Sequence, residues 1–192
     1  LIHGFLLLAV LVCIPGVSGQ LIINELDSDQ TGTDTQEFIE LYDGGTGNTP
    51  LDGYALVLFT GAGDISYLAL DLDGFTTDVN GYFVIGSLGM GTDIELDPGT
   101  QGWLENGPDA AALYQDDAVN FPNGTVVNAI NLLDAVVYDT DDPDASTLIS
   151  ILLNPGEGQV NENENGTGET ESIGRCPNGT GGARNTSTYE WD

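Results

Sequence analysis

The sequence has no lysine and only two arginines, Arg175 and Arg184, against 31 acidic residues, so its 192 residues carry a formal net charge of −29. Proteins that bind nucleic acids or anionic lipids use clustered Lys and Arg to displace counter-ions from phosphates. Two arginines cannot form such a surface. The scarcity of positive charge therefore excludes nucleic acids and anionic membranes as partners, and it leaves cations, cationic proteins and neutral glycans.

Histidine is almost absent, because His3 is the only one and it lies in an apolar N-terminal run. Without it, no histidine remains to activate a serine or cysteine nucleophile or to bind zinc. Paired carboxylates can hydrolyse glycosides, but among 31 acids such pairs arise by chance and no aromatic groove is indicated. We therefore expect a protein without enzymatic activity.

Cysteine is also scarce, with Cys13 and Cys176 as the two examples. If the N-terminal run is removed, Cys176 is left as an odd cysteine in a secreted protein, which predicts an intermolecular bridge or a buried thiol. If the run is retained, a Cys13–Cys176 disulfide is an alternative. The sequence leaves both open.

The first 19 residues, "LIHGFLLLAVLVCIPGVSG", have the pattern of a secretory signal peptide. An apolar centre from Phe5 to Ile14 precedes the breaker Pro15-Gly16, and Val17 and Gly19 fit the small residues before a cleavage point. The apolar run is short for a membrane span, and no second run follows. We expect residues 1–19 to be cleaved and residues 20–192 to form one secreted, extracellular domain; a retained apolar strand is the alternative.

Four N-x-[ST] sequons support a secreted glycoprotein, because this motif is the acceptor for N-linked glycans. Three of the four lie in the last third of the chain. The alternative is that they are Asn-Gly or similar turns that happen to precede Thr or Ser. The predicted glycosylation sites are Asn123, Asn165, Asn178 and Asn185.

Enough apolar residues are present to form a core, since 40% of the chain is hydrophobic and mean hydropathy is −0.04. Short runs rich in β-branched and aromatic residues alternate with Gly-, Asp- and Asn-rich breakers, a pattern typical of an all-β antiparallel sandwich or barrel. One helical turn is expected in "DPDASTLISILL", capped by Asp144 or Ser146. Residues 154–170 are expected to form an exposed polar loop. The predicted strands are "LIINEL", "QEFIELYD", "YALVLFT", "ISYLALDL", "GYFVIG", "DAAALYQ", "GTVVNAI" and "LLDAVVYD".

The motifs resemble, in order, those of the lamin tail domain family. The segments that carry the resemblance run from about residue 20 to 189 and are "LIINELD…DTQEFIELYD", "LDGYALVLFTG", "DLDGF", "GYFVIG", "FPNGT", "LLDAVVYD", "VNEN" and "SIGRCPNGTGGARNTSTYE". This resemblance implies an immunoglobulin-like β-sandwich. It also implies a domain without catalytic residues of its own. The chain differs from nuclear relatives in having no coiled coil, nuclear signal or basic surface.

Two acidic segments predict calcium sites. In "DSDQTGTD", residues Asp27, Asp29 and Thr31 match the first half of a calcium loop, and Asp34 closes the segment. The bidentate Glu of such loops is replaced by Phe38, with Glu37 or Glu40 as substitutes. The second segment, "DTDDPDAS", offers Asp139, Asp141, Asp142 and Asp144. Hard oxygen ligands favour Ca²⁺, and the alternative is a solvated acidic loop in which Asp and Gly form turns.

These features favour a secreted acidic glycoprotein with a structural role, which self-assembles into an extracellular filament or matrix. The alternatives are a soluble acidic protein that binds calcium or mineral, and a module that binds glycans or other extracellular proteins. The aromatic residues are expected in the core. Trp103, in the loop-like "GTQGWLENG", is the expected exception.

Overall fold

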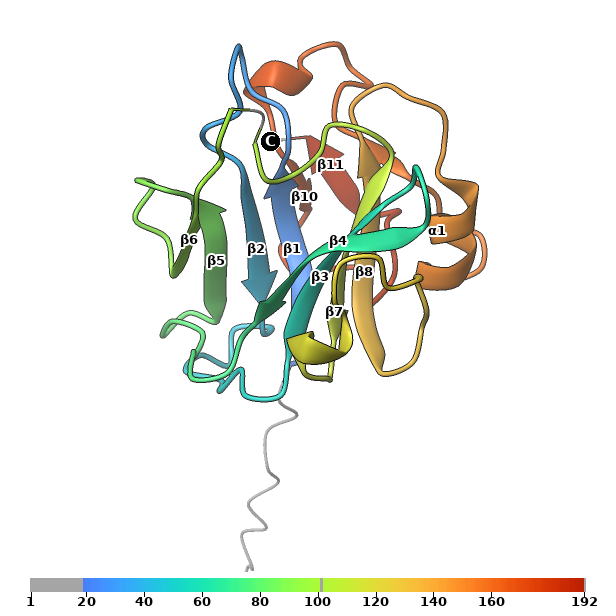
Figure 1. Cartoon of the computed structure of the whole chain (residues 1–192). Coiled ribbons are helices and arrows are strands. Elements are labelled where there is room, and N and C mark those ends of the chain that lie inside the picture. Colours follow the sequence, from blue (N-terminus) through green and yellow to red (C-terminus); the bar gives the residue numbers. More distant parts are fainter. Residues whose placement is uncertain (1–18, 101, 192) are drawn as a thin grey trace, which may run out of the picture.

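The computed structural model describes residues 19–100 and 102–191. In this part of the chain two β-sheets face each other, so the molecule is an all-β sandwich (Figure 1). The six-stranded sheet has the order β11-β10-β1-β2-β5-β6, and the five-stranded sheet has the order β4-β3-β7-β8-β9. The bounds are β1 Ile22–Asp27, β2 Phe38–Tyr42, β3 Ala55–Thr60, β4 Ile65–Asp71, β5 Tyr82–Ser87, β6 Ile94–Leu96, β7 Asp109–Tyr114, β8 Leu132–Asp139, β9 Val160–Asn161, β10 Ile173–Arg175 and β11 Tyr189–Trp191.

The period-2 pattern of β2 determines which face of the six-stranded sheet is buried. Ile39 and Leu41 point into the space between the sheets and are fully buried, whereas Phe38, Glu40 and Tyr42 lie on the outer face. A shift of one residue would bury Glu40 and expose both aliphatic side chains, so the burial of Ile39 and Leu41 fixes the register.

The five-stranded sheet is buried on both faces, which explains the continuous apolar sequence "ALVLFT" of β3. Leu56 and Leu58 contact the core between the sheets, and Val57 and Phe59 belong to a second core on the other face. Helix α1 (Ser146–Leu152) and the short 3-10 helix η1 (Ala118–Asn120) lie over that second core. Only the six-stranded sheet therefore keeps an outer face that no helix of the described residues covers (Figure 1).

The all-β prediction is confirmed, with several corrections in detail. Pairing is antiparallel except for two edge pairs, β5–β6 and β8–β9, which are parallel. The predicted strand "GTVVNAI" forms only a bridge between Val126 and Ile65, because this segment runs along the end of β4 and then turns inward to bury Val127. The immunoglobulin-like connectivity stays a prediction.

The predicted helix is present, but neither predicted cap is used. Helix α1 has Ala145 at its N-cap without a side-chain hydrogen bond, and Ser146 is already its first residue. No helix of the described residues is long and apolar enough to cross a membrane.

Two segments predicted to be loops contribute to the interior. Trp103 is 8% exposed, belongs to the central core and donates its indole N–H to Ser87 Oγ at 3.1 Å, so its predicted exposure is wrong. Residues 154–170 are largely exposed, but they also form β9 and the 3-10 helix η2 (Gly168–Thr170), and they bury Glu162 completely.

Candidate functional site

Acidic side chains gather at the end of the sandwich where β1 ends and β2 begins, which is the upper end in Figure 1. Three loops meet there, residues 28–37, residues 97–108 without residue 101, and residues 162–172. We call this region the acidic end. The loops are far apart in sequence, so the sheet topology alone brings them together.

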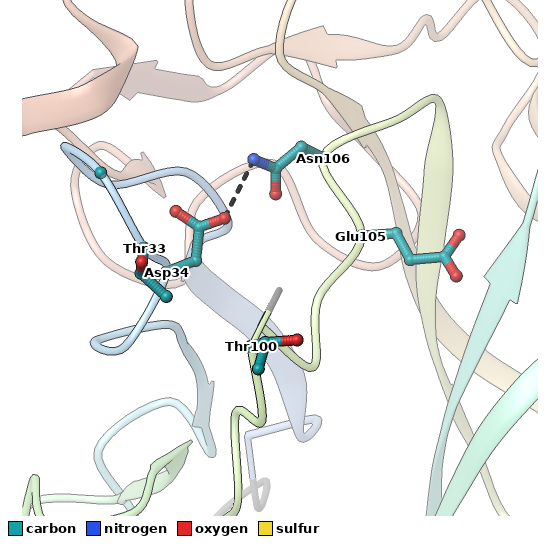
Figure 2. A pocket seen from close by; sticks show the side chains of 6 residues that line it. Thr33, Asp34, Thr100, Glu105 and Asn106 are labelled. Carbon is teal, nitrogen blue, oxygen red and sulfur yellow. Dashed lines mark hydrogen bonds between the residues drawn. The ribbon is translucent and has the colours of Figure 1, made fainter.

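Asn106 joins two of the predicted calcium ligands. Its Nδ2 donates to Asp29 Oδ1 at 3.1 Å and to Asp34 Oδ2 at 3.2 Å, and Figure 2 shows Asp34 and Asn106 facing each other while Glu105 extends away. The Oδ1 atom of Asn106 is buried and has no hydrogen-bond partner among the described residues. The amide thus uses its donor group to separate two carboxylates, and its acceptor is unused.

A cavity of about 450 Å³ opens beside this contact. Carboxylate, amide and hydroxyl groups supply most of its lining, and no basic group contributes. It is large enough for a hydrated ion or a small polar ligand. The lining residues are Gly32, Thr33, Asp34, Thr100, Glu105 and Asn106 (Figure 2).

Glu37 is a buried carboxylate at the base of the acidic end. Its Oε2 accepts the main-chain N–H of Trp103 at 2.6 Å. Its Oε1 is buried without a hydrogen-bond partner among the described residues and lies against Gly102. Gly102 has φ +85°, and a Cβ there would overlap Oε1. The pKa of Glu37 is raised to about 8, mainly by burial and also by the nearby charges of Asp34 and Asp27, which together outweigh the hydrogen bonds that lower it.

Glu162 holds the start of the 28–37 loop from the other side. It is fully buried and accepts hydrogen bonds from the hydroxyl of Ser28 at 2.6 Å and from its N–H at 3.3 Å. Burial raises the pKa of Glu162 to about 8, with Asp27 and Asp29 adding to the increase. Burial likewise raises the pKa of Asp27 to about 6. The raised pKa values show that no neighbouring positive charge offsets the burial of these carboxylates.

The first predicted calcium loop does not close around a common centre. Asp27 accepts the Gln30 side-chain amide at 2.6 Å, Asp34 accepts the Gln30 N–H at 3.0 Å, and the Thr31 hydroxyl is directed to the Glu169 carbonyl. Of the four predicted ligands, the structure brings together Asp29 and Asp34. Glu40 lies on the outer face of β2, where its Oε1 accepts the Asn24 amide.

The second predicted calcium segment is also dispersed. Asp139 is buried and accepts hydrogen bonds from the N–H groups of Thr140 and Asp142, so it stabilises the turn after β8. Asp141, Asp142 and Asp144 are exposed. Among the described residues, no three Asp, Glu, His or Cys side chains converge in a geometry that holds a metal ion. The oxygen ligands are of the type that calcium prefers, but their arrangement does not form a ready-made site.

Both arginines bind main-chain carbonyls and do not face the acidic end. Arg175 is buried, forms an ion pair with Asp134 at 3.1 Å and donates to the carbonyls of Ile23, Thr180, Gly182 and Asn185. Arg184 donates to the carbonyls of residues 151–153 at the end of α1. The only two lysine or arginine side chains in the sequence are thus used to hold the fold together.

All four sequons lie in turns or loops. Asn123, Asn165 and Asn178 are exposed and Asn185 is half-buried. Asn165 Oδ1 accepts the Thr167 hydroxyl at 2.6 Å, and Asn185 Oδ1 accepts the Ser187 hydroxyl at 2.8 Å. Glycosylation stays a prediction.

The predictions for the N-terminal run and its cysteine fall outside the described residues. These are the signal peptide at 1–19, apart from Gly19, and the pairing of Cys13. Cys176 is exposed at the end of β10, so the predicted buried thiol is wrong.

Sequence reasoning missed Asn106, Glu162 and Gly102 as parts of this region. Asn106 and Glu162 lie 77 and 134 residues from the groups that they contact, Asp29 and Ser28. The segment "VNENENG" around Glu162 is polar on both sides, so nothing in the local pattern marks a buried carboxylate. No protein-family model matches this chain, and a comparison with curated proteins gives no match. The resemblance to lamin tail domains stays a prediction.

Proposed function

We propose that this protein is a secreted acidic glycoprotein with a structural role, and that it gathers calcium at its acidic end. The observation that carries the proposal is the contact of Asp29 and Asp34 with Asn106, whose Oδ1 is buried without a hydrogen-bond partner among the described residues. Both arginines are committed to main-chain carbonyls elsewhere, so no lysine or arginine compensates these carboxylates. A cation from the surroundings is the remaining source of positive charge.

The chemistry of the acidic end favours a weak calcium site over a tight one. Calcium accepts six to eight oxygen ligands in flexible geometry, and extracellular modules bind it with dissociation constants of about 10⁻⁴–10⁻³ M. Asp29, Asp34 and the buried Asn106 Oδ1 offer such oxygens after rotation of the Asn106 amide, with water as the remaining ligands. The absence of a third converging carboxylate among the described residues supports millimolar affinity.

Calcium titration of thermal stability tests this proposal. A cation that binds only the folded state raises Tm by mass action, so 5 mM CaCl₂ at pH 8 should raise Tm more than 5 mM MgCl₂ or NaCl of equal ionic strength. Asn106→Leu should abolish the difference between Ca²⁺ and Mg²⁺, whereas Asn80→Ala, in a distant turn, should preserve it. Equal effects of the three salts on the unaltered protein would reduce the proposal to charge screening.

Self-assembly is the second candidate, and one observation favours it. β11 is an edge strand with an exposed Trp191, 37% accessible, and its outer main-chain groups have no neighbouring strand among the described residues. Edge strands add strands from neighbouring copies unless they are blocked. By contrast, "LIINEL" is not available for this role, because β1 pairs with β2 on one side and β10 on the other.

Light scattering at physiological salt separates the two candidates. Assembly that does not depend on calcium and is lost in Trp191→Glu supports the edge-mediated filament. A monomer at high concentration that saturates with calcium supports the binding protein alone.

A further inference from the structure

The outer face of the six-stranded sheet has an unusual composition for an uncovered surface. Tyr42 and Tyr82 are cross-strand neighbours whose rings stack with centroids 4.7 Å apart. Carboxylates from Glu25 and Glu40 lie on the same face, and Phe38 and Val84 continue it along β2 and β5. Since α1 covers the outer face of the opposite sheet, this face is the one that no helix of the described residues covers.

The chemistry of the face favours one kind of occupant. A second copy of the chain docked face to face would bring Glu25 and Glu40 against their equivalents, and like charges repel in a partly buried contact. Nucleic acid and anionic lipid are excluded by the same carboxylates. A neutral sugar suits the face, because aromatic rings pack against its C–H groups and carboxylates and amides accept and donate hydrogen bonds to its hydroxyls.

One sequon is built into the border of this face. Asn178 Nδ2 donates to the Tyr82 hydroxyl at 2.8 Å, and Asn178 Oδ1 accepts Asn24 Nδ2 at 3.2 Å. Asn24 is fully buried, and its Oδ1 also accepts the Gly179 N–H at 2.9 Å. The buried amide of Asn24 thus fixes both the side chain of the sequon and the residue that follows.

The turn that carries Asn178 lies directly on the tyrosine pair. The Thr180 N–H donates to the Pro177 carbonyl at 3.1 Å, and Gly179 has φ +77° between them. A Cβ on Gly179 would lie 3.0 Å from Tyr42 Cε1, so only glycine allows this close approach. The glycine of the sequon "NGT" is therefore required by packing against Tyr42, in addition to its place in the modification motif.

We infer that Asn178 carries an N-linked glycan whose first sugar packs beside Tyr82 and covers this border of the six-stranded sheet. The inference rests on the proposed function in one respect, since it needs passage through a secretory route. A primary amide has two N–H bonds, and the described residues provide Nδ2 with one acceptor, the Tyr82 hydroxyl. The second N–H faces no protein acceptor there, so a sugar can replace that hydrogen while the hydrogen bond to Tyr82 is kept.

The modification step balances with a donor from outside the chain. A bond forms between Asn178 Nδ2 and C1 of an N-acetylhexosamine as the C1–O bond of a lipid-linked diphosphate sugar breaks. The diphosphate leaves with the electron pair of that bond, and Nδ2 loses one proton.

Mass spectrometry of the full chain from a eukaryotic secretory host tests occupancy. The expected result is a glycopeptide at Asn178 in the unaltered chain and in Thr180→Ser, which keeps the sequon, and none in Thr180→Ala. A chain without glycan at any of the four sequons would overturn the secretory route and this inference together. Glycans at Asn123, Asn165 or Asn185 with a bare Asn178 would overturn this inference alone.

Packing is tested on protein trimmed to one sugar per site by an endoglycosidase. The Tyr82 ring should shift the N-acetyl methyl proton signal of the Asn178 sugar upfield, and Tyr82→Leu should remove this shift. Loss of the glycan through Thr180→Ala should lower Tm by about 2–4 °C. The unaltered chain and Thr180→Ala made in bacteria carry no glycans, so their difference in Tm measures the loss of the Thr180 hydroxyl alone. This difference should be smaller than the one between the glycosylated and unglycosylated chains. An unshifted methyl signal, or self-association through this face, would overturn the covering role.

Discussion

At the scale of single residues, Arg175 is the centre of a polar network in an otherwise apolar core. It forms the ion pair with Asp134, and its guanidinium lies over the Tyr189 ring at 4.9 Å from the ring centroid. Asp134 in turn accepts the N–H groups of Ile23 and Arg184. Arg175 therefore connects β1, β8 and the segment that leads to β11.

Replacing Arg175 with methionine should destabilise the protein by about 3–5 kcal/mol, because Asp134 would be left as a buried charge without its partner. Urea unfolding at pH 7 measures this change. The double variant Arg175→Met/Asp134→Leu should regain part of the loss, since no buried charge remains. If the single and double variants were equally unstable, the carbonyl contacts of Arg175 would account for the effect instead of the ion pair.

Glu37 and Glu162 predict an uncommon dependence of stability on pH. Burial raises both pKa values from 4.5 in the unfolded chain to about 8 in the folded protein. Between these values the folded state binds more protons than the unfolded state, so the free energy of unfolding decreases as pH rises from about 4.5 to 8. Urea unfolding at constant ionic strength should therefore show greater stability at pH 5.5 than at pH 8.

The matched variants separate this effect from general charge repulsion. Glu162→Gln should be more stable than the unaltered protein at pH 8 and similar to it at pH 5, because the amide cannot ionise. Glu164→Gln, an exposed neighbour in the same segment, should change neither the slope nor the stability by more than about 0.5 kcal/mol. Identical pH slopes in all three proteins would contradict the assignment to Glu162.

A different group governs the acid side of the pH profile. Burial raises the pKa of Asp43, but hydrogen bonds from Thr49, Thr77 and neighbouring N–H groups outweigh it, so the pKa is lowered overall. The stability that Asp43 contributes is present above its unfolded-state pKa of 3.8 and is lost as pH falls further. Stability should therefore be greatest near pH 5.

At the scale of elements, α1 completes the second core. Leu148 and Leu152, one turn apart, are its two buried residues and pack on the outer face of β7 and β8. The helix has no side-chain cap and no charged residue in its first or last turn, so packing and the contacts of Arg184 with its final carbonyls hold it in place.

Leu148→Ala should cost about 2–5 kcal/mol of stability, because truncation leaves a cavity between the helix and the sheet. Thr147→Ala, an exposed change in the same turn, is the control and should stay within about 0.5 kcal/mol. Circular dichroism and urea unfolding measure both variants. A loss below about 1 kcal/mol for Leu148→Ala would mean that the helix is not required to cover the sheet.

At the scale of the whole molecule, negative charge is unbalanced on the surface. The 31 acidic residues face two arginines, and both arginines bind carbonyls of the fold. Repulsion between like charges opposes the compact state and keeps molecules apart, and salt weakens it over a distance of about 10 Å at 0.1 M.

Removing exposed charge should therefore stabilise the protein at low salt. Asp141, Asp142 and Asp144 are exposed and adjacent, and their replacement by Asn should raise Tm in 20 mM NaCl and change it little in 0.5 M NaCl. Differential scanning calorimetry at both salt concentrations checks this. An increase that persists in 0.5 M NaCl would point to a local effect on the turn after β8.

Much of the fold could be predicted from the chain itself. Seven of the eight predicted strands are present, because short alternating or continuous apolar runs such as "EFIELY" and "ALVLFT", rich in β-branched and aromatic residues and flanked by turn residues, favour strands over helices. The short strands β6, β9, β10 and β11 were not predicted. Each has two or three residues, too few for a period to show, and its pairing depends on a longer neighbour.

By itself the sequence determined the shortage of positive charge, the presence of a single histidine at position 3, the strand pattern and the positions of the sequons. All of these are local or compositional properties. Tertiary structure alone decided where the charges lie. It placed Asn106 between Asp29 and Asp34, buried Glu162 under Ser28 and directed Arg175 to main-chain carbonyls. Asn106 and Asp29 are 77 residues apart, Glu162 and Ser28 are 134 apart, and Arg175 and Ile23 are 152 apart, so only the order of strands in the two sheets brings these partners together.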